Sequence, residues 1–87
     1  MDGDITREHL RCASANTIRV LRKRVGLAQD RFAYEAGVNR GFMGRLEQQR
    51  STPTLETIYK LLPLLKISFT EFAAEFERQL KRCRRQR

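Results

Sequence analysis

Hydrophobic positions along the chain recur at intervals of three and four residues, which is the spacing of one face of a helix. The first such run can begin near Thr6 or after Ser14, and Ser14 is a suitable N-cap. Gly26 follows the run and ends it, as glycine often does just beyond a helix. We expect the segment from Met1 to Ile5 to be a loose arm. The apolar positions of this first predicted helix are Ile18, Leu21 and Val25.

Two short helices follow, over about residues 28–36 and 40–48. Gly37 lies between them and suits a left-handed turn. Val38 should fill the space beneath that turn, and Asn39 is a good N-cap for the second of the two helices. The inward positions are Phe32, Ala33 and Ala36 on one helix and Met43 and Leu46 on the other.

The second half of the chain predicts two further helices. Pro53 and Thr54 open a fourth helix, and Pro63 should kink or end it near Leu62. The run from Ser68 to Glu71 has the form of a capping box before a fifth helix. No strand pattern occurs, so the predicted fold class is all-α with five helices. The apolar positions are Leu55, Ile58, Leu61, Leu62 and Leu65, then Phe69, Phe72, Ala73, Phe76 and Leu80.

The length and the charge of the chain limit the classes of function that it can have. The 87 residues suit one domain, and the formal net charge of +8 favours a polyanionic partner, nucleic acid first. The run from Arg78 to Arg87 holds six basic residues and no acid, a pattern typical of a disordered tail. Two alternatives remain for this tail: it adds non-specific affinity for DNA, or it does not contact DNA.

Cys12 and Cys83 lie far apart without metal-ligand spacing, so we expect two reduced thiols, no metal and no cofactor. His9 has no catalytic partner in the pattern, and an enzyme is the least favoured class. No apolar run reaches the roughly 20 residues of a membrane span, and the acidic start lacks a secretory pattern. We therefore expect a cytoplasmic protein that contacts no membrane.

Several runs of sequence together resemble the XRE/Cro/lambda-repressor-type helix-turn-helix DNA-binding family. The resemblance covers about residues 16–72 and implies a five-helix domain with the helix-turn-helix in the second and third helices. It divides the chain into an arm or helix extension over residues 1–14, a helix-turn-helix domain over 15–76 and a basic tail over 77–87. The runs are Ile18–Gln29, Ala33 with Ala36–Asn39, Arg45–Glu47, Thr52–Thr57 and Leu65–Ser68.

The resemblance also implies roles for single residues. Arg40, Gly41 and Arg45 match positions that face base edges, and an arginine fork pairs well with guanine in the major groove. Arg22 and Glu47 match an ion pair that ties the first helix to the third. Phe42 could pack in the core or contact the sugar-phosphate chain. The residues matched to backbone contact, with Phe42 added, are Gln29, Asn39, Phe42 and Gln48.

Two departures from the family pattern affect the turns. Ala28 stands where Ser or Thr is usual, so the second helix should lack a side-chain cap. Gln49 stands where glycine is common, so the turn after the third helix should be strained or differently shaped.

These observations favour a sequence-specific transcriptional regulator that binds double-stranded DNA as a homodimer on a palindromic operator. Phe76 and Leu80 extend the apolar stripe of the last helix beyond what the domain core needs, which predicts a dimer interface there. Alternatively, Phe76 folds onto the first helix near Leu10. The competing functions are a protein-interaction module of the same fold, such as an antitoxin or coactivator, and a general nucleic-acid binder. We expect no small-molecule ligand.

Overall fold

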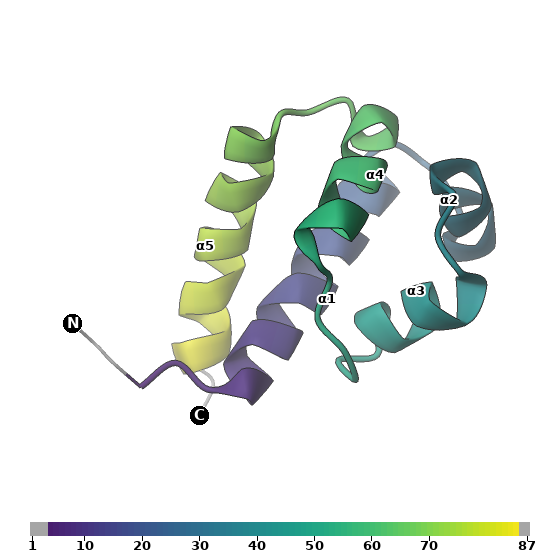
Figure 1. Ribbon diagram of the computed structural model, residues 1–87. Coiled ribbons are helices and arrows are strands. Elements are labelled where there is room, and N and C mark those ends of the chain that lie inside the picture. Colours follow the sequence, from purple (N-terminus) through teal and green to yellow (C-terminus); the bar gives the residue numbers. More distant parts are fainter. Residues whose placement is uncertain (1–3, 86–87) are drawn as a thin grey trace.

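The computed structural model describes residues 4–85, which contain five helices and no strand (Figure 1). This confirms the predicted all-α fold class. α2, α3 and α4 lie around one half of α1, and α5 lies along its other side (Figure 1). The helices are α1 (Arg7–Arg24), α2 (Gln29–Ala36), α3 (Arg40–Glu47), α4 (Leu55–Leu65) and α5 (Phe69–Arg85). No helix within residues 4–85 is both long and apolar enough to cross a membrane.

α1 begins at the earlier of its two predicted starts. The Thr6 hydroxyl accepts a hydrogen bond from the backbone amide of His9 at 3.1 Å, and the His9 Nδ1 accepts one from the amide of Thr6 at 3.0 Å. This capping box satisfies two amide donors at the helix start. Residues 7–14 are therefore a helix extension, with Ser14 buried inside α1. Of the predicted arm, residues 1–3 lie outside the described residues.

α5 packs along α1 and continues to Arg85, so the prediction of a disordered tail is wrong for residues 78–85 (Figure 1). Gln79 and Cys83 are buried in this segment. Like charges alone favour disorder, but here one residue in each turn faces α1 and is covered by it. The remainder of the predicted tail, residues 86–87, lies outside the described residues.

The prediction of two reduced thiols is also wrong, because Cys12 and Cys83 form a disulfide. The two residues are 71 positions apart in the sequence, and their Cα atoms lie 6.1 Å apart. The packing of α5 on α1 brings them together, which spacing along the chain could not reveal. The disulfide therefore links the beginning of α1 to the end of α5.

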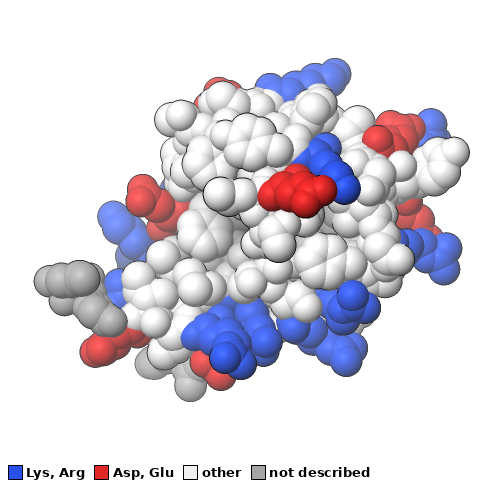
Figure 2. Space-filling model, viewed as in Figure 1, with Lys and Arg blue, Asp and Glu red and all other residues white. Residues whose placement is uncertain are grey.

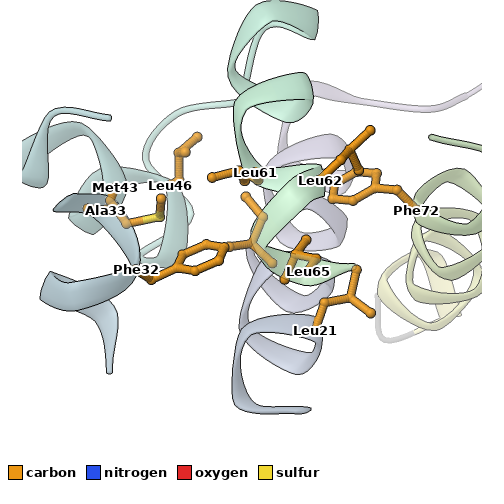
Figure 3. Packing of buried hydrophobic residues seen from close by; sticks show 10 residues of the cluster. Leu21, Phe32, Ala33, Met43, Leu46, Leu61, Leu62, Leu65 and Phe72 are labelled. Carbon is orange, nitrogen blue, oxygen red and sulfur yellow. The ribbon is translucent and has the colours of Figure 1, made fainter. Parts of the chain in front are cut away.

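The hydrophobic core joins all five helices (Figure 3). Phe32 and Leu61 are completely buried, and the Phe32 ring points from α2 toward α4 (Figure 3). Phe72 reaches the same cluster from α5, beside Leu62. The core thus fixes α2 and α3 against α1 and α4. The buried cluster consists of Ile18, Leu21, Phe32, Ala33, Met43, Leu46, Leu61, Leu62, Leu65 and Phe72.

α4 runs through Pro63 and ends at Leu65, so of the two predicted effects of Pro63, an end near Leu62 is wrong. A proline in a helix interior costs about 3 kcal/mol. The final turn, however, buries Leu62 and Leu65, and each buried leucine contributes about 1.5–3 kcal/mol. Pro63 itself is exposed, so its ring displaces no core residue. Lys66 then closes the helix in a left-handed conformation at φ +60°.

α5 also buries a carboxylate against α1. Glu75 accepts hydrogen bonds from Gln79 Nε2 at 2.7 Å and from Arg78 Nη2 at 2.6 Å. Burial raises the pKa of Glu75, but the hydrogen bonds from Gln79 and Arg78 outweigh it, and the pKa lies below its ordinary value.

Candidate nucleic-acid interface

α2 and α3 are joined by a tight turn centred on Gly37. Gly37 has a left-handed φ of +72°, which glycine adopts without steric cost. Its amide donates to the carbonyl of Tyr34 at 3.2 Å, and the amide of Val38 donates to the carbonyl of Ala33 at 2.9 Å. These bonds satisfy the last carbonyls of α2 and turn the chain into α3. As expected for Ala28, α2 begins without a side-chain cap.

α3 presents two distinct faces. Met43 and Leu46 are completely buried and anchor its inner face to the core. Arg40, Gly41 and Arg45 lie on its exposed side. Gly41 and Arg45, four positions apart, share one face of α3, and Arg40 is exposed at its first residue.

Asn39 caps the start of α3. Its side-chain oxygen accepts a hydrogen bond from the backbone amide of Phe42 at 2.9 Å. The side-chain nitrogen of Asn39, which can only donate, is left for another partner. Asn39 is exposed, so it can serve both as a cap and as a contact to an anion.

The far end of α3 is tied to α1 by a buried ion pair. Arg22 donates from Nε to Glu47 Oε2 at 2.7 Å and from Nη2 to Glu47 Oε1 at 2.9 Å. Its third nitrogen, Nη1, donates to the carbonyl of Leu27 at 2.8 Å. Both charged residues are at most 8% exposed. This two-pronged geometry fixes the direction of α3 as well as its distance from α1.

Gln29 joins the same cluster from the first residue of α2. Its Nε2 donates to Glu47 Oε1 at 3.2 Å, which leaves one amide hydrogen for a further acceptor. Gly44 lies beneath it: a Cβ atom added there would be 3.9 Å from Gln29 Oε1. Gln29 therefore connects the start of α2 with the back of α3.

Arg19 is a member of this cluster that the sequence interpretation missed. It donates from Nη2 to the backbone carbonyl of Glu47, the last residue of α3. Its Nε lies 3.9 Å from the carboxylate of the same residue. Arg19 precedes Arg22 by three positions on α1, and such residues share a helix face. That spacing was the signal in the sequence that could have placed Arg19 beside the Arg22–Glu47 ion pair.

The outer face of α3 is lined by cationic and aromatic groups. The guanidinium of Arg45 lies over the ring of Phe42, 5.6 Å from its centroid. Phe42 is half-buried and also packs against the core, so it combines its two predicted environments. Arg40 lies 3.7 Å from Asp30, and both are exposed. Figure 2 shows basic side chains gathered along the lower edge of the molecule, where α3 lies.

The segment after α3 is exposed and has an unusual backbone. Gln48 ends α3 and is exposed, in line with the surface position expected for it. Gln49 has a left-handed φ of +64°, the conformation that a glycine would adopt more readily. The substitution for glycine therefore leaves backbone strain at this turn.

Phe76 and Leu80 lie on α5, outside the polar cluster around Glu47. Both are half-buried on α5. Phe76 lines a hollow together with Leu10 of α1 and Ile58 of α4, which places it near the first helix, as in the monomeric alternative. Part of its surface remains accessible.

Comparisons with known proteins agree with this geometry. A model of the HTH_3 helix-turn-helix family matches residues 18–72. The HTH-type transcriptional regulator SutR of Escherichia coli (strain K12) is 31% identical over 65 residues, or 75% of this chain and 36% of SutR. The chain therefore spans about a third of the length of that curated relative.

Two solved structures have a similar fold. An HTH_3 family transcriptional regulator from Vibrio cholerae matches with a TM-score of 0.71 and 32% identity, over 87% of this chain and 41% of that one. A mutant of the restriction-modification controller protein C.Esp1396I matches with a TM-score of 0.75 over 83% of this chain and 96% of that one. Its identity of 19% supports similarity of fold alone.

The family match covers more than half of the 87 residues and contains α2, α3 and α4 completely. It also includes Arg22 and Glu47, which anchor α3, and every residue assigned to its outer face. This confirms the resemblance recognised in the sequence. The chain belongs to the HTH_3 helix-turn-helix family.

Proposed function

We propose that this protein is a sequence-specific transcriptional regulator that binds double-stranded DNA and reads the major groove with α3. The observation that carries the proposal is the construction of α3. Its charged anchor, Glu47, is buried against α1 at the last residue of the helix, whereas Arg40 and Arg45 are exposed. A helix held from behind in this way can enter a groove without releasing Glu47 from α1.

The side chains on α3 suit the chemistry of base edges. Arg40 and Arg45 each carry a planar fork of donors that pairs with O6 and N7 of guanine. Gly41 lies between them and lets the helix backbone approach the bases closely. We assign Arg40, Gly41 and Arg45 to base reading.

Residues around the ends of α2 and α3 suit the DNA backbone. Gln29 and Asn39 each retain an amide donor beyond their contacts within the protein, and such donors bind phosphate oxygens. Gln48 is exposed at the end of α3, and Phe42 offers an aromatic face beside Arg45. We assign Gln29, Asn39, Phe42 and Gln48 to backbone contact.

We further propose a homodimer on a palindromic operator, with Phe76 and Leu80 in its interface. A two-fold dimer places two reading helices about 34–36 Å apart, one turn of B-DNA. Phe76 and Leu80 remain partly accessible on α5. Figure 2 shows a largely uncharged surface over α4 and α5, which an acidic and a basic side chain interrupt. A second copy of the chain would cover this surface and bury both residues.

Selection of binding sites from a random duplex pool tests the function. We expect an enriched palindromic sequence, and affinity for it should fall steeply as salt rises, because several phosphate contacts release counterions. Enrichment of no sequence, together with a flat dependence of affinity on salt, would refute DNA binding by this chain.

Sedimentation of a Phe76→Glu, Leu80→Glu variant tests the interface. We expect the variant to sediment as a monomer at concentrations where the wild type is dimeric. Thr70→Glu is the control, because Thr70 is exposed in the first turn of α5, six positions before Phe76 and ten before Leu80. A folded double variant with the mass of the wild type would place the dimer surface elsewhere.

A protein-interaction module of the same fold is the second candidate. Leu55 and Tyr59 of α4 are 65% and 57% exposed, which is unusual for large apolar side chains on one helix. Anisotropy measurements with selected and random duplexes separate the two candidates. Equal, weak affinity for both duplexes would favour the protein-interaction module.

A further inference from the structure

A chain of polar contacts connects the disulfide with the end of α3. The Asn16 Nδ2 lies 3.6 Å from Cys83 Sγ and 3.8 Å from Cys12 Sγ. The Asn16 Oδ1 accepts a hydrogen bond from Arg19 Nη1 at 3.4 Å. Arg19 in turn donates from Nη2 to the backbone carbonyl of Glu47. Arg19, through Asn16, therefore links the Cys12–Cys83 disulfide to the last residue of α3.

The end of α3 needs such a partner. The last four carbonyls of a helix have no amide donors within the helix, and a cation placed there interacts favourably with the helix dipole. α3 has only eight residues, two of them glycine, so it depends on its neighbours for order. Arg19 supplies a charged donor to the carbonyl of Glu47, while Arg22 holds the carboxylate of the same residue.

We propose that Arg19 is a positioning residue for DNA reading. It holds the last turn of α3 against α1 through the Glu47 carbonyl, and Asn16 holds the Arg19 fork in the required direction. This inference rests on the proposed function, in which α3 reads the bases. Arg19 acts through α3 and needs no contact with DNA.

A direct phosphate contact by Arg19 makes different predictions. Loss of a phosphate contact weakens binding to all duplexes alike and reduces the salt slope by about one. Loss of a positioning contact weakens binding to the selected duplex, whose bases must meet α3 in one orientation. Binding to random duplex, which depends on charge, is spared.

The test compares Arg19→Ala with Lys23→Ala. Lys23 is exposed on α1, so the control removes the same charge from the same helix. We expect Arg19→Ala to weaken binding to the selected duplex about tenfold more than the control does, the effect of losing one hydrogen bond to a charged group. Affinity for random duplex should match that of the control. An equal loss on both duplexes, with a reduced salt slope, would overturn the proposal.

Arg19→Lys provides a second variant that keeps the charge. Lysine has one nitrogen, whereas arginine contacts Asn16 and Glu47 through two separate nitrogens. We expect wild-type affinity for random duplex and an intermediate affinity for the selected one. Full recovery of selected-duplex binding would show that charge alone suffices and would contradict the proposed role of the fork.

Amide hydrogen exchange tests the same contact without DNA. The amides of Gln48 and Arg50 donate to the carbonyls of Gly44 and Arg45, and they report on the last turn of α3. We expect them to exchange faster in Arg19→Ala than in Lys23→Ala, with a smaller change in Asn16→Ala. If these amides are unchanged, the positioning role is wrong whatever the protein binds. If they change but no duplex is selected, the proposed function fails and the contact stands.

Discussion

α3 and α5 both carry arginines on their outer surfaces, but the rest of the molecule holds them in opposite ways. α3 is short, contains two glycines and ends in a polar cluster around Glu47. α5 is about twice as long, packs along α1 and is joined to it by the Cys12–Cys83 disulfide. α3 thus adds directional polar contacts to two buried core residues, whereas α5 is held by buried length and a covalent bond.

This difference suits the two helices to different tasks. The hydrophobic effect is not directional, so apolar packing constrains the orientation of a helix only through the shapes of its buried side chains. A bidentate ion pair constrains orientation as well as distance. The reading of bases requires orientation, and the proposed reading helix has the directional anchor. α5 needs only to remain in place against α1.

The largest effect should come from removing the anchor of α3. Glu47→Ala leaves Arg22 buried without its carboxylate, which typically costs about 3–5 kcal/mol of unfolding free energy. Glu56→Ala is the control, because Glu56 pairs with Lys60 on the exposed side of α4, and such surface pairs contribute at most about 1 kcal/mol. Thermal and urea unfolding measure both.

A double-mutant cycle between Arg22 and Glu47 then isolates the pair. We expect a coupling energy well above that of Glu56 with Lys60, measured in the same buffer. Equal coupling in the two cycles would show that Glu47 anchors α3 no better than a surface ion pair.

Local sequence signals were sufficient for the helix-turn-helix itself. Gly37, Val38 and Asn39 act through neighbours within a few positions, so their turn and cap can be predicted from the sequence. The pairing of Arg22 with Glu47 required a family resemblance, because 25 positions separate them. The fold class followed from hydrophobic spacing in the same way.

The features that were missed depend on tertiary packing. Cys12 and Cys83 meet only because α5 lies along α1. The same packing orders the basic run after Arg78, whose local composition favours disorder. Burial of Leu65 likewise carries α4 past Pro63. In each case a contact distant in sequence outweighs a local preference.

Loss of the disulfide should have the second largest effect and should act on the other helix. The bond closes a loop of 71 positions, and disulfides of this kind typically contribute about 2–4 kcal/mol, mainly by restricting the unfolded chain. We expect a reductant to lower the unfolding temperature of the wild type. A Cys12→Ser, Cys83→Ser variant should unfold at the reduced value and should not respond to reductant. Equal unfolding temperatures with and without reductant would contradict this contribution.

Substitution on the outer faces should affect DNA binding and leave stability nearly unchanged. Arg45→Ala on α3 should cost about 1–3 kcal/mol of binding to the selected duplex and relax specificity at one position in each half-site. Arg82→Ala on α5 removes an exposed charge and should lower affinity for all duplexes alike or not at all. Both variants should unfold within about 0.5 kcal/mol of the wild type.

Full specificity in Arg45→Ala would show that the proposed reading face is wrong. A base-specific loss in Arg82→Ala would instead assign sequence reading to α5. Affinity measurements on a set of duplexes with single substitutions in the selected site distinguish these outcomes.

The smallest effect should come from replacing either of the two glycines of α3 by alanine. These substitutions test whether the low helix propensity of glycine is retained there because it helps DNA binding. A Cβ at Gly44 would meet only Gln29 Oε1, at an ordinary contact distance of 3.9 Å. Gly44→Ala should therefore stabilise the protein by up to about 1 kcal/mol through helix propensity.

At Gly41 the Cβ would lie 3.1 Å from Asn39 Oδ1, the oxygen that caps α3. Gly41→Ala should gain less, because displacement of a cap costs about 1 kcal/mol. Thermal unfolding ranks the two variants, and binding to the selected duplex completes the test. If glycine at the proposed reading position lets the backbone approach DNA, Gly41→Ala will bind the selected duplex more weakly than Gly44→Ala does. If Gly41→Ala binds as well as the wild type, Gly41 has no part in the approach to DNA.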